Sequence, residues 1–210
     1  MSSLALFFVG SVLLLNGLGL LGLIGPKETA PINLFIGSTL VATVAVTALG
    51  VSGSSEAELS TVLSSSGFLL FAFTYLYVAY NNFKDLPGGG LGWYCGWAAL
   101  VAAFLSWVNF DRFDDPKFGV IWLAWVVLFG AFFALLALGW DFIAKATGWL
   151  AILEAFTTTT VPGALMLTGR WDDVSTTMVV AVHVLVVVVF LGLAATHNRS
   201  ATTRLEGANA

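Results

Sequence analysis

Long apolar segments alternate with short polar ones along the whole chain. Seven of these segments are long enough to cross a hydrocarbon layer ~30 Å thick, which takes about 20 helical residues. The pattern therefore predicts an all-α, polytopic membrane bundle of seven helices, packed as one transmembrane domain over 1–197. The predicted spans are 4–24, 32–51, 62–81, 91–108, 118–139, 147–168 and 176–196. The small, polar tail over 198–210 is expected to be disordered and cytoplasmic.

Composition agrees with a protein whose main partner is membrane lipid. The chain is 59% hydrophobic and only 10% charged, which excludes an ordinary soluble domain. Its connections are short and carry no basic patch for nucleic acid. The single cysteine, Cys95, permits neither an internal disulfide nor a cysteine metal cluster. No metal-ligand spacing and no Ser/His/Asp constellation is visible, so we expect no cofactor and no enzymatic activity.

Basic residues in the connections predict an orientation in the cell membrane. The positive-inside rule assigns the side richer in lysine and arginine to the cytoplasm. The basic residues on one predicted side are Lys27, Lys84, Lys145, Arg199 and Arg204, and those on the other are Arg112, Lys117 and Arg170. This difference predicts an N-terminus outside the cell and a C-terminus in the cytoplasm.

Two tryptophans lie deeper in a predicted span than membrane tryptophans usually do. Most membrane tryptophans sit at the water interfaces. Trp122 and Trp125 lie roughly 9 Å and 4.5 Å from the midpoint of the fifth span, at ~1.5 Å rise per residue. They share one helical face with Phe129. Such a stripe is compatible with core packing and also with the wall of a narrow path.

Other spans offer polar and aromatic candidates at a similar depth. Glu154 is the one carboxylate inside a predicted span, and buried charge is costly enough in a bilayer to suggest function. Snorkelling to the interface or pairing with a donor is the alternative reading. Asn16 in the first span and the pair Phe73 and Tyr77 in the third lie at comparable depth, on the predicted cytoplasmic half. His183, in the seventh span, is expected to bond a backbone or threonine group.

Several motifs make the chain resemble a known family. They are VGSVLLLNG (9–17), the Pro26-Lys27 turn with NLFIG (33–37), FAFTYLYVAYN (71–81), IWLAWVVLF (121–129) and WLAILEA (149–155). Over roughly 4–169 the chain resembles the AmiS/UreI family of urea and amide channels. The resemblance implies a pore within each protomer, six protomers in a ring, and urea or short aliphatic amides as permeants. We add Asn16 to the pore-lining residues that the resemblance implies, because it lies on the same helical face as those of the first span. The full set is Leu6, Val9, Leu13, Asn16, Phe73, Tyr77, Trp122, Trp125, Leu128, Phe129 and Glu154.

The chain also departs from the acid-gated urea channel of that family, and this favours the amide-transport branch. That channel has tryptophan where Phe129 stands, six spans in place of seven, and pH-sensing histidines in its outer loops. The outer segments 52–61 and 109–117 contain no histidine here, so we predict a passive channel that acid does not open. Formamide, acetamide and urea fit equally well as permeants.

Two other classes of function are known for bundles of membrane helices. An ion-coupled secondary transporter of a small polar solute is the main alternative. It is disfavoured because no predicted span holds a lysine or arginine to pair with Glu154. A seven-helix light sensor needs a membrane-embedded lysine for its chromophore, whereas Lys84 and Lys145 both lie in connections.

Overall fold

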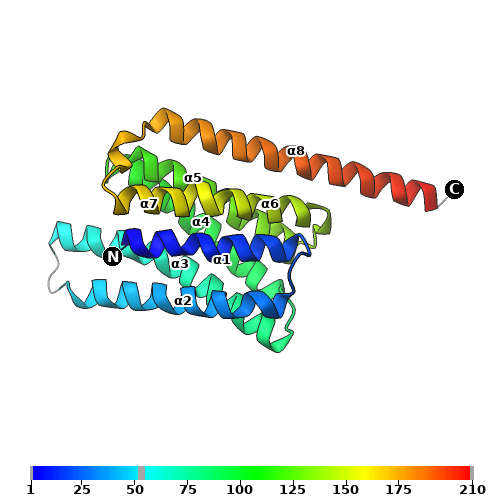
Figure 1. Ribbon diagram of the computed structural model, residues 1–210, viewed down its shortest axis with the longest axis horizontal. Coiled ribbons are helices and arrows are strands. Elements are labelled where there is room, and N and C mark those ends of the chain that lie inside the picture. Colours follow the sequence, from blue (N-terminus) through cyan, green and yellow to red (C-terminus); the bar gives the residue numbers. More distant parts are fainter. Residues whose placement is uncertain (1, 52–54, 209–210) are drawn as a thin grey trace.

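Long, nearly parallel helices make up the chain, as Figure 1 shows for a computed structural model that describes residues 2–51 and 55–208. No strand occurs within those ranges. The elements are α1 (Ser2–Leu20), α2 (Pro26–Leu49), α3 (Glu56–Lys84), α4 (Gly89–Asp111), α5 (Pro116–Leu136), η1 (Asp141–Ile143), α6 (Ala144–Glu154), η2 (Ala155–Thr160), α7 (Val161–Leu167), η3 (Trp171–Asp173) and α8 (Thr176–Ala208).

The seven predicted spans are confirmed, with corrected ends. Seven helical stretches in the described residues are long and apolar enough to cross a membrane, and the sixth runs through η1, α6, η2 and α7 from Asp141 to Leu167. The third helix begins at Glu56, six residues before the predicted start at 62, because Ser55 and Glu58 form a capping box. The fifth begins after Asp115, whose side chain accepts a hydrogen bond from the Phe118 N–H.

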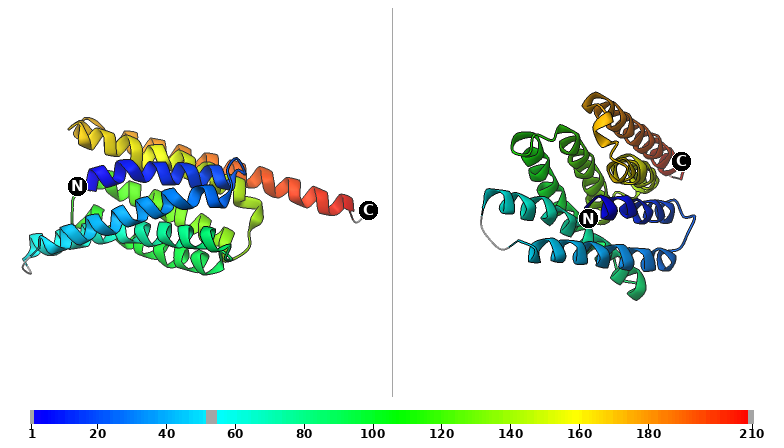
Figure 2. Two further views of the ribbon diagram at one scale, coloured as in Figure 1. Left: turned by 60° about the horizontal axis from the view of Figure 1, so that its bottom comes forward. Right: turned by 60° about the vertical axis from the view of Figure 1, so that its left-hand side comes forward.

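Over 198–208, where the sequence predicts a disordered tail, the backbone continues α8 as a helix. Adding residues to an existing helix avoids the cost of nucleation, and this segment contains alanine, arginine, leucine and glutamate, which favour helix. In Figures 1 and 2 the end of α8 extends beyond the other helices. Val179, His183 and Val186 are the buried residues of its bundle-facing side, which packs on α5 and α6.

Glycines let α1 approach the sixth span closely. A Cβ atom added at Gly10 would collide with Thr160 and with the Ala155 carbonyl oxygen, and one at Gly17 would lie 2.7 Å from the Gly148 oxygen. Close backbone approach through small residues is the usual way in which membrane helices pack without a hydrophobic driving force. The α1–α6 contact that this creates fixes one wall of the bundle interior.

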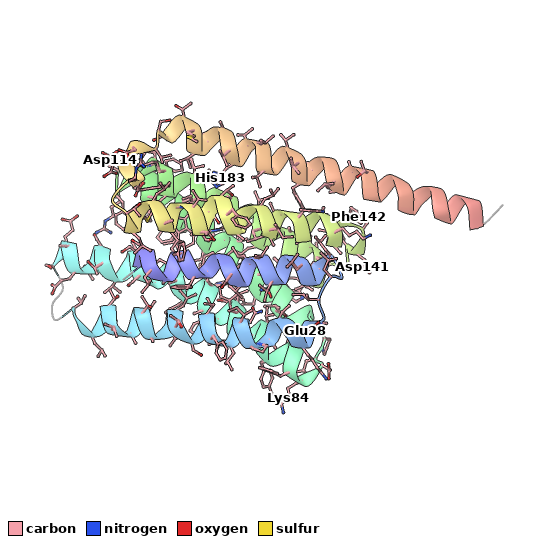
Figure 3. The ribbon with its side chains drawn as sticks, in the orientation of Figure 1. Glu28, Lys84, Asp114, Asp141, Phe142 and His183 are labelled. Carbon is pink, nitrogen blue, oxygen red and sulfur yellow. The ribbon has the colours of Figure 1, made fainter. Side chains whose placement is uncertain are left out.

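Charged side chains gather at the two ends of the bundle. In Figure 3, Asp114 lies at one end, and Glu28, Lys84 and Asp141 lie at the other. Ion pairs form within each end: Lys27 with Asp85 at 2.8 Å, and Lys117 with Asp172 at 3.6 Å. The apolar length of the helices lies between these ends, as expected for a protein that spans a bilayer.

A candidate pore between two cavities

Two cavities lie one after the other along the bundle axis. The first, of about 420 Å³, takes its lining from Ser3, Leu6 and Val9 of α1, and the second, of about 220 Å³, from Leu13, Asn16 and Leu20 of the same helix. The lining residues of α3 and α5 follow the same order: those of the second cavity lie further along α5 and further towards the C-terminal end of α3. The two cavities therefore lie towards opposite ends of the bundle.

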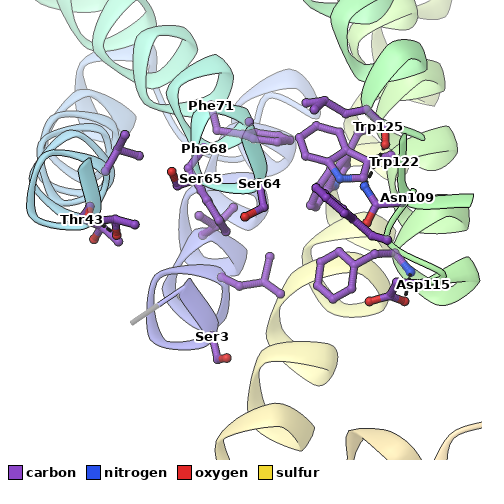
Figure 4. A pocket seen from close by; sticks show the side chains of 18 of the residues that line it. Ser3, Thr43, Ser64, Ser65, Phe68, Phe71, Asn109, Asp115, Trp122 and Trp125 are labelled. Atoms are coloured by element: carbon purple, nitrogen blue, oxygen red, sulfur yellow. Dashed lines mark hydrogen bonds between the residues drawn. The ribbon is translucent and has the colours of Figure 1, made fainter. Parts of the chain in front are cut away.

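Phe71 lines both cavities and stands at the centre of an aromatic partition between them. Its ring centroid lies 4.7 Å from that of Trp125 in an edge-on contact, 5.1 Å from that of Phe129, and 6.2 Å from that of Trp122. Trp122 and Trp125 also meet edge to face, at 4.7 Å and 87°. Such contacts orient the rings firmly. Figure 4 shows Phe71, Trp122 and Trp125 converging at the first cavity.

The deepest tryptophan is fixed by a hydrogen bond to the sixth span. The Trp125 indole N–H donates to Thr158 Oγ1 at 3.0 Å, and that hydroxyl donates to the Glu154 carbonyl at 2.6 Å. Thr158 lies in η2, a π-helical stretch that precedes Pro162. Proline cannot donate to the helix ladder, and π-helical turns often accompany such interruptions. The hydroxyls of Thr157 and Thr159 likewise donate to carbonyls four residues back.

Eight of the predicted pore residues do line the two cavities. Leu6, Val9, Trp122 and Trp125 line the first, and Leu13, Asn16, Leu128 and Phe129 line the second. All of these are buried except Asn16, which is half-buried. The aromatic stripe seen in the sequence is thus a cavity wall as well as packed core.

The structure corrects the predicted face of the third span. Phe73 and Tyr77 are 49% and 37% exposed on the outside of the protomer and line neither cavity. Phe71 and Tyr75 take their places on the inside. Two residues along a helix correspond to a rotation of about 200°, so the prediction chose the opposite face. Aromatic rings at 71, 73, 75 and 77 gave both faces similar weight.

Glu154 is buried in the bundle but lies behind the cavity walls. Its side chain is fully buried, it lines neither cavity, and neither of its carboxyl oxygens has a hydrogen-bond partner among the described residues. It lies within electrostatic range of the Tyr75 hydroxyl. That hydroxyl, on a residue of the second cavity, also has no partner in the described part of the chain.

The second cavity has a polar wall, in which Asn16 was predicted from the sequence but its hydrogen-bond partner was not. The Asn16 side-chain amide donates to Asn33 Oδ1 at 3.0 Å, and Asn33 donates back to Asn16 Oδ1 at 2.6 Å. Nearby, Asn82 Nδ2 donates to Thr29 Oγ1 at 2.9 Å. Each pair joins side chains from two different helices, so pairing depends on how the helices pack.

The first cavity is lined by hydroxyl groups that bond within their own helices. Thr43 donates to Thr39 O at 2.8 Å, Thr47 to Thr43 O at 2.9 Å, and Ser65 to Val62 O at 3.0 Å. Because each proton is engaged locally, these oxygens face the cavity mainly as hydrogen-bond acceptors. Figure 4 shows Thr43, Ser64 and Ser65 around the cavity.

The remaining titratable candidate, His183, has the predicted backbone partner. Its Nδ1 lies 2.7 Å from the Val179 carbonyl oxygen, and its Nε2 is buried with no partner in the described ranges. Among the residues that the structure describes, no group of three or more His, Cys, Asp and Glu side chains could hold a metal ion.

Comparison with known proteins gives consistent matches to one group of transporters. Residues 1–170 match the family described as AmiS/UreI family transporter. A putative amidate substrates transporter protein of Mycolicibacterium smegmatis is 42% identical over 172 residues, which cover 82% of this chain and 79% of that protein. The putative transporter protein AmiS2 of Rhodococcus erythropolis is 41% identical over 194 residues, 92% of this chain and 91% of that protein.

A solved structure has the same fold. The urea channel of Helicobacter pylori in its closed state, determined by cryo-electron microscopy, superposes with a TM-score of 0.73 at 30% identity. The match covers 81% of this chain and 100% of the urea channel. The family match ends at residue 170, so α8 lies beyond it.

Proposed function

Because the chain belongs to the AmiS/UreI family of membrane transporters, we propose that it is a passive channel for small uncharged amides such as formamide and acetamide, and for urea. The observation that carries this proposal is the aromatic partition around Phe71, with one cavity on each side of it. The permeant would leave one cavity, pass between the rings and enter the other.

The chemistry of the partition suits a planar, dipolar solute. Moving an amide out of water without replacement of its hydrogen bonds costs several kcal/mol, in the range of about 2–7. Aromatic faces can contact the plane of the amide while the Tyr75 hydroxyl and the carboxamides of the second cavity replace water. Hydrated ions lose far more on entering such a constriction, which therefore favours uncharged permeants.

Passive flux is favoured over ion coupling by the position of Glu154. A coupled transporter needs an ionisable group that the driving ion can reach. Glu154 is fully buried and lines neither cavity. Uptake against a gradient that collapses with an uncoupler would support the coupled alternative.

Three further features belong to the proposal. We expect flux to be unaffected by acid, because the outer segments 52–61 and 109–117 carry no histidine. We place the N-terminus outside and the C-terminus in the cytoplasm of the cell membrane, following the lysine and arginine bias. We also propose a hexamer of protomers, each with its own pore, in which Phe73 and Tyr77 face lipid or a neighbouring protomer.

Solute flux into proteoliposomes tests the function. Acetamide should enter vesicles with protein faster than protein-free vesicles. Trp125→Ala should lower that flux by about ten-fold or more, since it removes an aromatic face that contacts the plane of the amide in place of water. Trp93→Ala is the matched control, because Trp93 is 65% exposed and lines neither cavity. Equal acetamide entry with and without protein would refute the channel. A steep rise at acid pH would refute acid independence alone.

A further inference from the structure

We propose that Asn16 and Asn33 form a selection site for solutes with a primary-amide edge, a proposal that rests on the channel function above. Their two reciprocal hydrogen bonds, 3.0 and 2.6 Å long, close a ring in which each carboxamide presents one N–H and its own C=O to the other. A primary amide in solution carries the same edge. A permeant with this edge can therefore take the place of one asparagine and bond both the N–H and the C=O of the other.

The two asparagines are not equally free to open the pair. Asn33 is fully buried, and its Nδ2 also donates to the Thr29 carbonyl at 2.9 Å, so both of its N–H groups are engaged. Asn16 is half-buried and lines the second cavity, whereas Asn33 does not. Asn16 is thus the side chain that turns, and Asn33 is the fixed half that receives the permeant.

Exchange at this site keeps the number of hydrogen bonds on Asn33 constant. When a permeant pairs with Asn33, the bonds that Asn16 gives up are replaced one for one, and the return of Asn16 releases the permeant. Net differences between equivalent hydrogen bonds are small, which suits a channel where binding must not prevent exit. The second cavity, at about 220 Å³, is several times the roughly 30 Å³ that one water occupies in the liquid and so has room for a small amide beside the pair.

The site makes a specific chemical distinction. In a secondary amide the favoured trans form holds the N–H opposite to the C=O, so the two groups cannot form the paired edge together. Propionamide and N-methylacetamide are isomers of equal size, but only propionamide has the primary edge. The site should therefore pass propionamide and resist N-methylacetamide.

Flux of these two isomers into the same proteoliposomes tests the site. In the wild type we expect propionamide flux, after subtraction of protein-free vesicles, to exceed N-methylacetamide flux by about ten-fold, the order of magnitude lost with one hydrogen bond at a desolvated site. Asn16→Leu should bring the ratio close to one. Asn16→Gln, which keeps a carboxamide, should give a ratio above that of Asn16→Leu. The ratio does not depend on how much of each variant folds.

Thr74→Val is the matched control, because Thr74 lines the same cavity but donates only to the Leu70 carbonyl of its own helix, so its ratio should equal that of the wild type. A wild-type ratio near one, or an unchanged ratio in Asn16→Leu, would overturn the selection site and leave the channel standing. If neither isomer enters wild-type vesicles faster than protein-free ones while acetamide does, the selection site is refuted and the channel stands. Equal acetamide entry with and without protein refutes both.

Discussion

The two cavities hold their polar groups in different ways. In the first, the hydroxyls of Thr43, Thr47 and Ser65 donate to carbonyls three or four residues back in their own helices. In the second, Asn16 bonds across to α2, as does Asn82 from α3. Hydroxyls that bond within their own helix keep the same geometry when neighbouring helices shift. Hydrogen bonds between carboxamides of different helices form only when the helices are packed together. We infer that the first cavity collects solutes with little discrimination and that the second selects among them.

The difference in volume, about 420 against 220 Å³, gives the largest expected effect. Val44 lines the first cavity and Val78 the second, so the same substitution can be made in each. Val78→Trp should lower acetamide flux by more than about ten-fold, because the added ring fills most of a small, closely packed space. Val44→Trp should lower it by less than about three-fold, since more space remains. Proteoliposome flux normalised to reconstituted protein measures both.

Equal inhibition by the two valine substitutions would contradict the comparison, because the narrow cavity would then not limit flux. Each variant should give a single symmetric peak in size-exclusion chromatography, so that a loss of folded protein is not mistaken for a loss of flux through the channel. The orientation of the vesicles does not matter for this test, because passive flux depends on the whole path.

The boundary between the cavities is the next target. Phe71→Ala removes the ring that contacts Trp125, Phe129 and Trp122. We expect the free energy of unfolding in detergent to fall by about 3–5 kcal/mol, the usual range when a phenylalanine in a packed core is replaced by alanine. Flux of a bulkier amide such as butyramide should rise several-fold relative to acetamide, because the constriction widens. Phe73→Ala, on the exposed side of the same helix, is the control and should change neither quantity appreciably.

An unchanged butyramide-to-acetamide ratio in Phe71→Ala would show that the size limit lies elsewhere. Leu13 and Leu128, which line the second cavity below the partition, would then be the next residues to truncate.

A smaller effect is expected from the hydrogen bond that orients Trp125. Thr158→Val removes the acceptor of the indole N–H but keeps the shape of the side chain. We expect acetamide flux to change by about three-fold, since one neutral hydrogen bond contributes on the order of 1 kcal/mol. Thr159→Val is the matched control, because Thr159 is also buried in η2 and donates to a carbonyl four residues back, but accepts no bond from a tryptophan. Identical flux in the two variants would show that the indole bond is structural only.

The fold and one wall of the candidate pore could be predicted from the sequence for clear physical reasons. Apolar segments of spanning length have few alternatives to transmembrane helices, and the deep pair Trp122 and Trp125 marked its own helical face. The inward face of the third helix could not be identified in this way, because its aromatic rings alternate between opposite faces. Glu154 illustrates a second limit: its depth was predictable, but whether it faces a cavity depends on the packing of α6 against its neighbours.

The carboxamide pair shows why tertiary contacts escape a single sequence. Asn16 and Asn33 are 17 residues apart, on two helices joined by the turn at Gly22 to Gly25. Their pairing depends on the register of α1 against α2, which no periodicity within either helix encodes. The helix beginning at Glu56 is the opposite case, because the Ser55 and Glu58 signal was local and could have been found in the sequence.

Cys95 offers the most delicate probe of the comparison, since it is the one cysteine of the chain and lines the second cavity with its side chain 1% exposed. A small thiol reagent that enters by the path should react with it slowly, because a buried thiol forms little thiolate, and should then narrow the smaller cavity. We expect flux of acetamide to fall by about half, and Cys95→Ser to remove this sensitivity while changing untreated flux by less than about two-fold, because serine is of similar size.

The rate at which the reagent modifies Cys95 should also depend on the side of the membrane from which it enters. Because the second cavity lies towards the end of the bundle that carries Asn82 and Pro26, a reagent confined to that side should inhibit sooner than one that must first pass the Phe71 partition. Equal rates from both sides would mean that the partition opens freely to the reagent. Excess acetamide should slow the reaction from either side if solute and reagent share one path, and an unaffected rate would place Cys95 off the route of permeation.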